Sequence, residues 1–445
     1  MSSTVTAPRT DSAGILRLGA PIGAAMVGAV LLPLLVFAIL GWLSSDALYV
    51  RSLYIPLSQL FVALIVAFDA STQTAVARAV GARRTDDLSG LMWTSIALSF
   101  AFGAALTVVV VVTAPALADL LHVAPHAREL FIGFVRWTSA ASALLMLPIA
   151  PAALLRGSGR SGAAAVITLG GALVELSAVA ALAYGTGLGV WSVPVSMAMA
   201  TAVALTIAAW QLRRSGLIKS PRRGTVNREA LVYLRRVGLP VAGTFVALFG
   251  FSTAQLWIMG PFGESRVSGF SLAVTLQAVL IQPALAIGAA SAIMINQRLG
   301  AGERSRLLPS LWAGLRVVLW VYIPLSAAVW LLTPGMAGLL TNDTAAAAEA
   351  ARYLRIVGPS YLFMGMTLAA FTVLEQIGKG LLGLCLNVVF FAALSVIGYL
   401  VTRGDGGPAD FYWALSIGNV GGVLATLVAV VAVRHLARAG TRERQ

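Results

Sequence analysis

Long apolar runs recur along the whole chain, separated by short connections rich in charge, Pro or Gly. Each run reaches the about 20 residues that a helix needs to cross the hydrocarbon of a bilayer. These runs lack the polar face that a helix on a soluble core would carry. We therefore predict an all-α polytopic membrane protein with twelve transmembrane helices at 14–43, 52–79, 88–118, 130–155, 162–185, 188–212, 232–260, 266–297, 308–333, 350–374, 380–402 and 409–433.

The connections between these runs alternate in charge. One set is rich in Arg, as around Arg83 and in the stretch 213–236, whereas the opposite set holds acids such as Asp119 and Glu264. Arg and Lys gather in cytoplasmic loops, so the first set and both termini are expected in the cytoplasm. Arg, Ala and Gly are abundant and Lys is scarce, a usage typical of GC-rich bacteria. We expect a multi-pass protein of the bacterial cytoplasmic (inner) membrane.

An ungapped internal repeat relates the two halves of the chain. A shift of 219 residues superimposes Pro21 on Pro240, Gly81 on Gly300, Pro115 on Pro334, Arg136 on Arg355 and Gly159 on Gly378. Six crossings per half give both halves the same orientation, which predicts two six-helix bundles related by a parallel repeat. The expected parts are an N-terminal tail 1–13, a first lobe 14–212, a basic linker 213–231, a second lobe 232–433 and a tail 434–445.

Three short motifs mark the ends of the expected second, fourth and tenth helices. They are Thr74 to Ala82 (TAVARAVGA), Leu155 to Arg160 (LRGSGR) and Leu374 to Lys379 (LEQIGK). With the early Pro21, their order over residues 14–436 resembles the multidrug and toxic compound extrusion (MATE) transporters, and the TAVAR ending resembles the DinF-like bacterial subgroup. The resemblance implies a V-shaped pair of bundles, alternating access, and export of amphipathic, often cationic compounds against H⁺ or Na⁺.

The chain departs from that family where the family holds its coupling acids. The DinF-like subgroup has an Asp in helix one where Val36 stands here, and an Asp in helix five near Val179. Glu175 replaces the Asn one turn before that second position, and Leu248 is nearest to the acid of helix seven in the sodium-linked subgroup. The resemblance therefore carries over no coupling residue, although Glu175 occupies the same neighbourhood.

Two acids lie well inside the expected helices, Asp69 in helix two and Glu175 in helix five. An ionisable side chain in hydrocarbon costs several kcal/mol, so it needs a partner, a wet cavity or a function. The hypothesis is that Glu175 is the main proton carrier and that Asp69 assists it or contacts a cationic substrate. The alternative is a buried carboxylate satisfied by neighbours such as Ser71 or Thr72. Glu375 is expected at the cytoplasmic rim, solvated or in a salt bridge.

Uncharged polar and Met side chains inside the expected helices could contact substrate. We select Gln73, Gln277, Gln282, Asn387 and Met364. The alternative for the polar ones is hydrogen bonding between helices, and for Met364 plain packing. Pro21 and Pro240 are expected to bend helices one and seven, because Pro removes a backbone hydrogen bond and clashes with the preceding turn. Either proline could serve as a moving hinge or as a static kink.

Several function classes fit the sequence poorly. The net charge of +14 is spread over the loop positions that set topology, which argues against nucleic-acid binding. His122 and His126 have helical spacing but lack further ligands for a zinc set, so no metal site is expected. All three His lie at helix ends or in loops, which argues against an enzyme. No phosphate-binding loop motif is present, so no cofactor is expected beyond a coupling H⁺ or Na⁺.

The leading prediction is a monomeric secondary transporter that exports a small-molecule substrate, surrounded by membrane lipids. The alternative is a flippase for a lipid-linked precursor or polysaccharide. A flippase would need several Arg residues facing a cavity to hold pyrophosphate. Arg is almost absent from the interiors of the expected helices.

Overall fold

The computed structural model describes residues 11–43, 45–218, 226–340, 343–403 and 406–439, and every regular element in these ranges is helical. Eleven stretches in the described ranges are long and apolar enough to cross a membrane. One of them, Thr344–Val401, holds two of the predicted crossings, 350–374 and 380–402. The predicted all-α polytopic fold is therefore confirmed.

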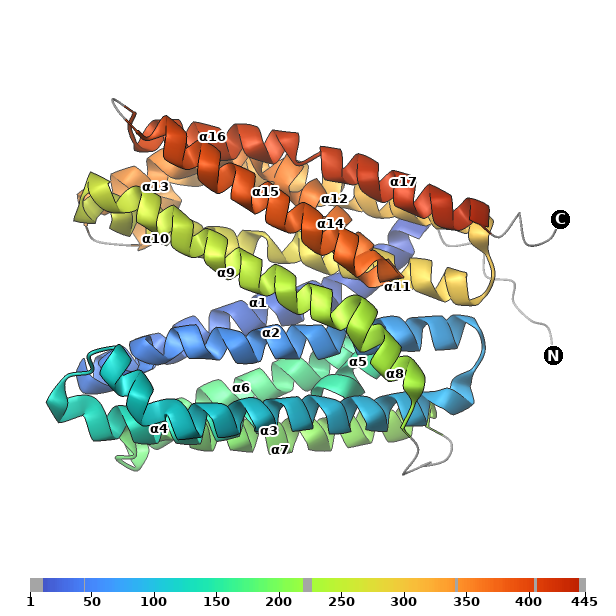
Figure 1. Ribbon diagram of the computed structural model, residues 1–445, viewed down its shortest axis with the longest axis horizontal. Helices are drawn as coiled ribbons and strands as arrows, with labels where there is room; N and C mark the ends of the chain where they lie inside the picture. Colours follow the sequence, from blue (N-terminus) through green and yellow to red (C-terminus); the bar gives the residue numbers. More distant parts are fainter. Residues whose placement is uncertain (1–10, 44, 219–225, 341–342, 404–405, 440–445) are drawn as a thin grey trace. The chain divides into compact units, whose positions relative to one another are not determined.

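By their contacts, the residues form two compact units. Residues Ala24–Ala242 make one of them, which we call the first unit. Its helices run side by side along their length in Figure 1, with α2 packed on α3 and α5, α3 on α4, and α6 on α5 and α7. Its elements are the later part of α1 (Asp11–Leu43), α2 (Ser45–Gly81), α3 (Leu88–Leu120), α4 (Arg128–Leu144), α5 (Ile149–Gly157), α6 (Ser161–Gly185), α7 (Ser192–Ser215), α8 (Arg228–Tyr233) and a π-helical turn, Leu234–Gly238.

The second unit contains the start of α1, up to Gly23, and the residues from Gly243 onwards. Within it α10 packs on α13, α11 on α14, and α12 on both α11 and α13. Its elements are α9 (Leu239–Met259), α10 (Glu264–Leu280), α11 (Gln282–Gly300), α12 (Leu307–Leu340), α13 (Thr344–Val357), α14 (Tyr361–Leu374), a π-helical turn Glu375–Lys379, α15 (Gly380–Val401), α16 (Pro408–Gly421) and α17 (Leu424–Ala439).

Four predicted helices are interrupted. The run 130–155 is divided into α4 and α5 just before Ile149, because Pro148 has no amide hydrogen to continue the helix. The run 266–297 is divided at Ile281 for the same reason, since Pro283 follows. The run 350–374 breaks at Gly358–Ser360, around Pro359, and 409–433 breaks after Gly421. Apolar content alone did not register these breaks, because most of the residues around them are apolar or small.

The backbone repeats its unusual conformations at the 219-residue spacing. Gly159 and Gly378 both have positive φ, +88° and +92°. Arg83 and Gly302, which also correspond, have φ of +59° and +76°. A left-handed conformation is costly for a residue with a side chain, so its recurrence at matching positions supports the duplication.

The division between the units falls inside α1 and α9, after Gly23 and after Ala242. The two division points correspond under the repeat, since Gly23 and Ala242 each lie two residues beyond a proline, Pro21 or Pro240. The predicted lobes 14–212 and 232–433 would keep each of these helices within one lobe. The difference arises because the first turns of α1 pack on α11 of the second unit, where a Cβ on Gly19 would lie in ordinary van der Waals contact with Ala290 Cβ, at 3.6 Å.

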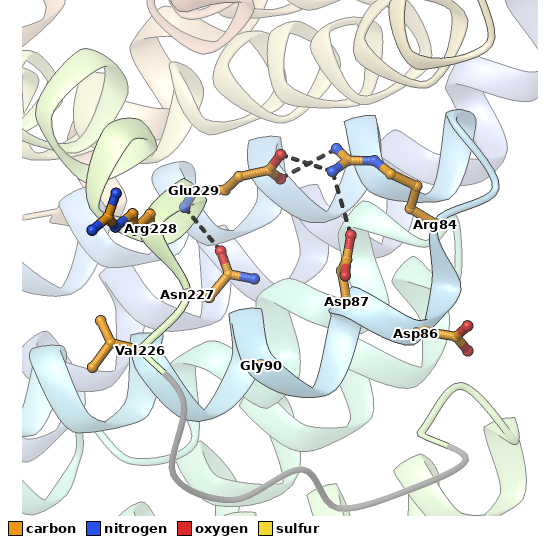
Figure 2. Close-up of a pocket in the computed structure, with 8 residues that line it drawn as sticks. All are labelled: Arg84, Asp86, Asp87, Gly90, Val226, Asn227, Arg228 and Glu229. Atoms are coloured by element: carbon orange, nitrogen blue, oxygen red, sulfur yellow. Dashed lines mark hydrogen bonds and ion pairs between the residues drawn. The ribbon is translucent and has the colours of Figure 1, made fainter.

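An ion pair holds the start of α8 within the first unit. The guanidinium of Arg84 donates to both carboxylate oxygens of Glu229, at 2.8 and 3.2 Å, and to Asp87 at 3.3 Å. Figure 2 shows the Arg84 guanidinium placed between these two acids. The hydrogen bond to Glu229 raises the pKa of Arg84 above its usual value. Asn227 caps α8 by accepting a hydrogen bond from the Glu229 amide at 2.8 Å.

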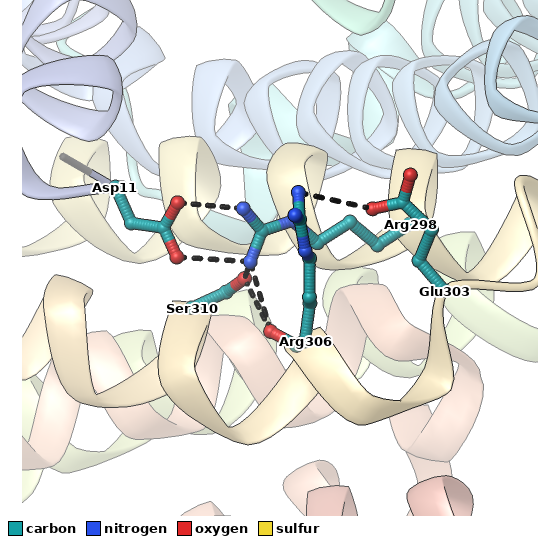
Figure 3. A network of polar contacts seen from close by, with 5 residues as sticks. All are labelled: Asp11, Arg298, Glu303, Arg306 and Ser310. Carbon is teal, nitrogen blue, oxygen red and sulfur yellow. Dashed lines mark hydrogen bonds and ion pairs between the residues drawn. The ribbon is translucent and has the colours of Figure 1, made fainter. Parts of the chain in front are cut away.

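A second ion pair holds the start of α1 within the second unit. Arg298 at the end of α11 donates to both oxygens of Asp11, at 2.6 and 2.9 Å. The same guanidinium reaches the carbonyl of Arg306 at 2.8 Å and the hydroxyl of Ser310 (Figure 3). Each first turn, of α1 and of α8, is thus bound to an Arg at or just beyond the end of the second helix of the other half of the sequence, Arg298 and Arg84.

Candidate functional site

Glu175 lies half-buried on α6, in the first unit. The charge that acts on its carboxylate is that of Arg51, near the start of α2. Arg51 is also half-buried, and its guanidinium carbon lies 5.7 Å from the centre of the Tyr54 ring. Tyr54 packs edge-on against Phe134 at 5.6 Å. The predicted proton carrier therefore lies in the field of a cation that itself packs on an aromatic ring.

Asp69 is held elsewhere in the same unit, in an ion pair with Arg156 of α5. The Arg156 side chain is 11% exposed and that of Asp69 29% exposed. Arg51 and Asp69 are both on α2, 18 residues apart, which corresponds to about 27 Å along a helix. The structure therefore does not bring Asp69 to the surroundings of Glu175. It also shows that Arg156, expected in a cytoplasmic connection, lies inside the unit.

The prediction that Glu375 lies at the cytoplasmic rim, solvated or in a salt bridge, is wrong. It begins the π-helical turn after α14 and is 7% exposed, so it is buried and not solvated at a rim. Its Oε1 accepts hydrogen bonds from the Thr244 hydroxyl of α9 at 2.6 Å and from the Asn387 amide of α15 at 3.2 Å. Both are neutral donors. Three helices of the second unit thus meet at one buried carboxylate.

The internal repeat contains a signal that would have identified Glu375 as a candidate site residue. Arg156 and Glu375 correspond under the 219-residue shift, so a charged residue stands at the same place in both halves. In the first half Asp69 balances Arg156, but the counterpart of Asp69 is Gly288. A Cβ on Gly288 would lie 2.9 Å from the Ala369 carbonyl oxygen, so α11 has no room there for a larger residue.

Four of the five predicted substrate-binding residues are packed within a unit. Asn387 is bonded to Glu375, and Gln282 donates to the carbonyl of Ala278 at 2.7 Å. Gln73, Gln282, Asn387 and Met364 are all at most 9% exposed. Gln277 is half-buried, and its side-chain oxygen accepts from Tyr353 at 2.5 Å and from Tyr361 at 3.2 Å. Since no ligand tests these roles, they stay predictions.

Beside Gln277 lies a cluster of aromatic rings around Glu349 of α13. Glu349 is 7% exposed and accepts a hydrogen bond from the Tyr412 hydroxyl at 2.8 Å. The rings of Tyr353 and Phe270 pack against Tyr412, with centroids at 5.1 and 6.1 Å. Besides Tyr412, a carboxylate oxygen of Glu349 lies 4.0 Å from the Arg352 guanidinium one turn later on α13.

The two predicted bending prolines lie in different surroundings. Pro240 is the second residue of α9 and directly follows the π-helical turn Leu234–Gly238. Pro21 lies within α1, which continues past it to Leu43. No group of three or more His, Cys, Asp or Glu that could hold a metal occurs in the described part of the chain.

A duplicated set of apolar helices with a half-buried carboxylate in the first unit and a buried one in the second is the design of a multi-pass secondary transporter. The sequence profile of the MatE family matches residues 21–179 and 240–400. The chain belongs to this family. The narrower DinF-like subgroup stays a prediction.

Named relatives and solved structures agree with this assignment. The probable multidrug resistance protein YoeA of Bacillus subtilis is 20% identical over 73% of this chain and 72% of its own length. The probable multidrug resistance protein NorM of Pseudomonas putida is 27% identical over 63% and 66%. An outward-facing multidrug resistance MATE family transporter superimposes with a TM-score of 0.88 at 20% identity over 96% of this chain and 97% of its own. The Vibrio cholerae MATE transporter VcmN in the bent form gives 0.87 at 18% identity over 96% and 97%.

Proposed function

We propose that this chain is a secondary active exporter of small amphipathic or cationic compounds, driven by antiport of H⁺ or Na⁺ through alternating access. Membership of the MatE family supports this function, as do relatives named probable multidrug resistance proteins. An ion gradient can supply the energy, because each charge that crosses 100 mV contributes about 2.3 kcal/mol. We further propose a bacterial inner-membrane location, cytoplasmic termini and a monomeric working unit.

The observation that carries the proposal is the environment of Glu375. An ionised carboxylate in an apolar interior is strongly unfavourable unless a cation or a proton neutralises it. In the described structure, its hydrogen-bond partners Thr244 and Asn387 are neutral. The hydroxyl and amide oxygens of these two residues could join the carboxylate around Na⁺, or the carboxylate could take up H⁺. Either event changes the charge inside the second unit, which a coupling site requires.

We propose that Glu175 is the coupling group of the first unit, at a position that is not the repeat mate of Glu375. Its carboxylate is half-buried, and Arg51 provides a positive charge that a bound cation would have to oppose. A proton therefore suits this position better than Na⁺. Asp69, predicted as its assistant, is assigned to holding α2 on α5 through Arg156. For substrate contact we favour Gln277, because it is the least buried of the predicted set and its amide nitrogen can still donate.

The flippase alternative lacks structural support. Inside the first unit, Arg51 acts on Glu175, Arg156 pairs with Asp69, and Arg78 packs over the Tyr233 ring. These contacts occupy the arginines that a pyrophosphate group would need.

The test is substrate-evoked H⁺ movement in proteoliposomes that contain the purified protein, with a panel of amphipathic cations as substrates. Glu375→Gln and Glu175→Gln keep the size of each side chain but remove its titrating group. We expect each variant to lower coupled transport about tenfold or more. A loss of about 1.4 kcal/mol in the free energy of binding the coupling ion already weakens that binding about tenfold. Replacing H⁺ by a Na⁺ gradient in the same vesicles distinguishes the two ions.

Glu129→Gln is the matched control, since the Glu129 side chain is 91% exposed on α4, and it should leave transport unchanged. Coupled transport that persists in both glutamine variants would contradict the coupling sites but not export itself. Absence of movement of any cation, with uptake of a lipid-linked sugar instead, would contradict the proposed function.

A further inference from the structure

Arg316 is a charged residue on α12 that neither the coupling sites nor the topology explains. It is the only charged residue of the sequence between Arg306 and Asp343, inside the predicted crossing 308–333. Its side chain is exposed on the helix surface. An arginine on the lipid-facing side of a crossing is costly unless its guanidinium reaches a polar group.

The surface around Arg316 is apolar and carries two tryptophans. Trp312 and Trp320 lie one helical turn before and after it and are 47% and 59% exposed. Ile323 continues the same stripe at 55% exposed. Leu311 and Leu315, on the inner side of the helix, are buried. The exposed stripe is therefore the side of α12 that meets lipid, and Trp is the residue preferred where lipid meets water.

The direction of the helix brings the guanidinium towards headgroups. Side chains on a helix lean towards its N-terminus. The N-terminus of α12 follows the basic turn Arg304–Arg306, the side that the distribution of Arg predicts to be cytoplasmic. Arg316 is ten residues beyond Arg306, or about 15 Å along the axis. A long side chain that leans back over one turn shortens that distance and reaches the level of Trp312.

The repeat shows that the fold itself does not require this charge. Trp93 of α3 corresponds to Trp312 and is also exposed, at 37%. The counterpart of Arg316 is Ala97, exposed on the same face of α3. Both halves therefore keep a tryptophan on this face, but a cation was added to the second half alone.

A further arginine lies at the same depth of the second unit. Val433 of α17 packs in one hydrophobic cluster with Leu311 and Leu315 of α12. Arg434, the next residue, is exposed. Since α17 packs on α12, this second positive charge stands on a helix that neighbours the one carrying Arg316.

We propose that Arg316, between Trp312 and Trp320, forms a binding site for an anionic phospholipid of the cytoplasmic leaflet. The planar guanidinium donates two hydrogen bonds to the lipid phosphate, and the tryptophans cover the glycerol and the first part of the acyl chains. The site would retain one lipid of this class at the edge of the second unit. A zwitterionic phospholipid carries an amine that offsets the attraction, so it should bind more weakly.

The test is native mass spectrometry of the purified full-length protein, titrated with phosphatidylglycerol or phosphatidylethanolamine of matched chains. We expect one phosphatidylglycerol to bind at least about tenfold more tightly than phosphatidylethanolamine, and Arg316→Gln to remove that difference. Arg355→Gln, which removes another exposed arginine of the same unit, is the matched control and should keep it. Equal binding of the two lipids, or an unchanged preference in Arg316→Gln, would overturn the proposal.

A second measurement avoids dependence on the folding of Arg316→Gln. In nanodiscs, brominated phosphatidylglycerol should quench the fluorescence of Trp312, taken as wild type minus Trp312→Phe, at lower mole fraction than brominated phosphatidylethanolamine. Identical quenching curves would show ordinary annular lipid and reject the site.

Discussion

At the residue scale, the two halves use one position in different ways. Arg156 and Glu375 correspond under the repeat, yet one is paired with Asp69 and the other is bonded to Thr244 and Asn387. An ion pair within the protein satisfies both charges permanently, whereas a lone carboxylate can exchange its proton or bind a cation. The duplication therefore gave one half a structural contact and the other half a group suited to coupling.

The Asp69–Arg156 pair yields a prediction about stability. Asp69→Ala leaves the nearly buried Arg156 without its partner, and we expect a loss of about 3 kcal/mol of unfolding free energy. The double variant Asp69→Ala with Arg156→Met should recover much of that loss, because neither charge remains. Thermal unfolding in detergent gives the values for a double-mutant cycle. Strictly additive losses would show that the two residues do not interact.

At the element scale, a tyrosine from a third helix forms hydrogen bonds with the backbone on both sides of the break between α10 and α11. The Tyr322 hydroxyl of α12 donates to the Leu280 carbonyl at 2.8 Å and accepts from the Ala284 amide at 3.1 Å. Tyr322 is fully buried. A helix broken inside a membrane must satisfy its free backbone groups within the protein, and this hydroxyl satisfies one donor and one acceptor.

Tyr322→Phe removes only that hydroxyl, and we expect it to lower the free energy of unfolding by about 1–3 kcal/mol, since both backbone groups lose their partner. Tyr184→Phe is the matched control, because the Tyr184 hydroxyl donates to the Ile39 carbonyl at an exposed position. The comparison of melting temperatures in detergent checks the difference. A melting temperature for Tyr322→Phe equal to that of Tyr184→Phe would contradict this role of the Tyr322 hydroxyl at the helix break.

The π-helical turn before α9 depends on a close approach at Gly238. A Cβ there would lie 2.9 Å from the Ala67 carbonyl oxygen of α2 and 2.8 Å from Leu234 Cδ1. Gly238→Ala should therefore destabilise the first unit by about 1–3 kcal/mol through overpacking. Gly250→Ala on α9 meets nothing within 4 Å and should stabilise by up to about 1 kcal/mol. Chemical unfolding measures both variants, and the same sign for both would refute this account.

At the scale of the whole molecule, α1 and α9 each contribute to both compact units. The division points after Gly23 and Ala242 correspond under the repeat, and Gly23 and Ala242 each follow a proline by two residues. The ion pairs Asp11–Arg298 and Glu229–Arg84 hold the first turns in their units. If the units move during transport, Pro21 and Pro240 are placed to absorb the bending, since each removes a backbone hydrogen bond.

This placement predicts opposite effects on stability and transport. Pro21→Ala restores a helical hydrogen bond and should raise the free energy of unfolding, by up to about 3 kcal/mol. The same change should slow substrate export, because α1 bends less readily at Gly23. Pro33→Ala, further along α1 and away from the division point, is the control. Export at the wild-type rate by Pro21→Ala would indicate a static kink.

The sequence predicted correctly those features that the thickness of the bilayer determines. Hydrocarbon thickness fixes the length of an apolar run, so the crossings and the all-α fold followed from the pattern of residues. The duplication also followed, because glycines such as Gly159 and Gly378 mark backbone conformations that few other residues adopt. These features depend on the solvent and on the local backbone, and both can be read from residues close together in the chain.

Only the tertiary structure decided how the charged residues are satisfied. Asp69 meets Arg156 from 87 positions away, and Glu375 meets Thr244 from 131 positions away. Contacts between residues this far apart in the chain produce no periodic pattern in the sequence, because a single residue on each helix suffices for the contact. The sequence by itself therefore determined a duplicated, twelve-crossing membrane protein. The packing of helices in three dimensions determined that Asp69 is paired and that Glu375 is buried beside neutral donors.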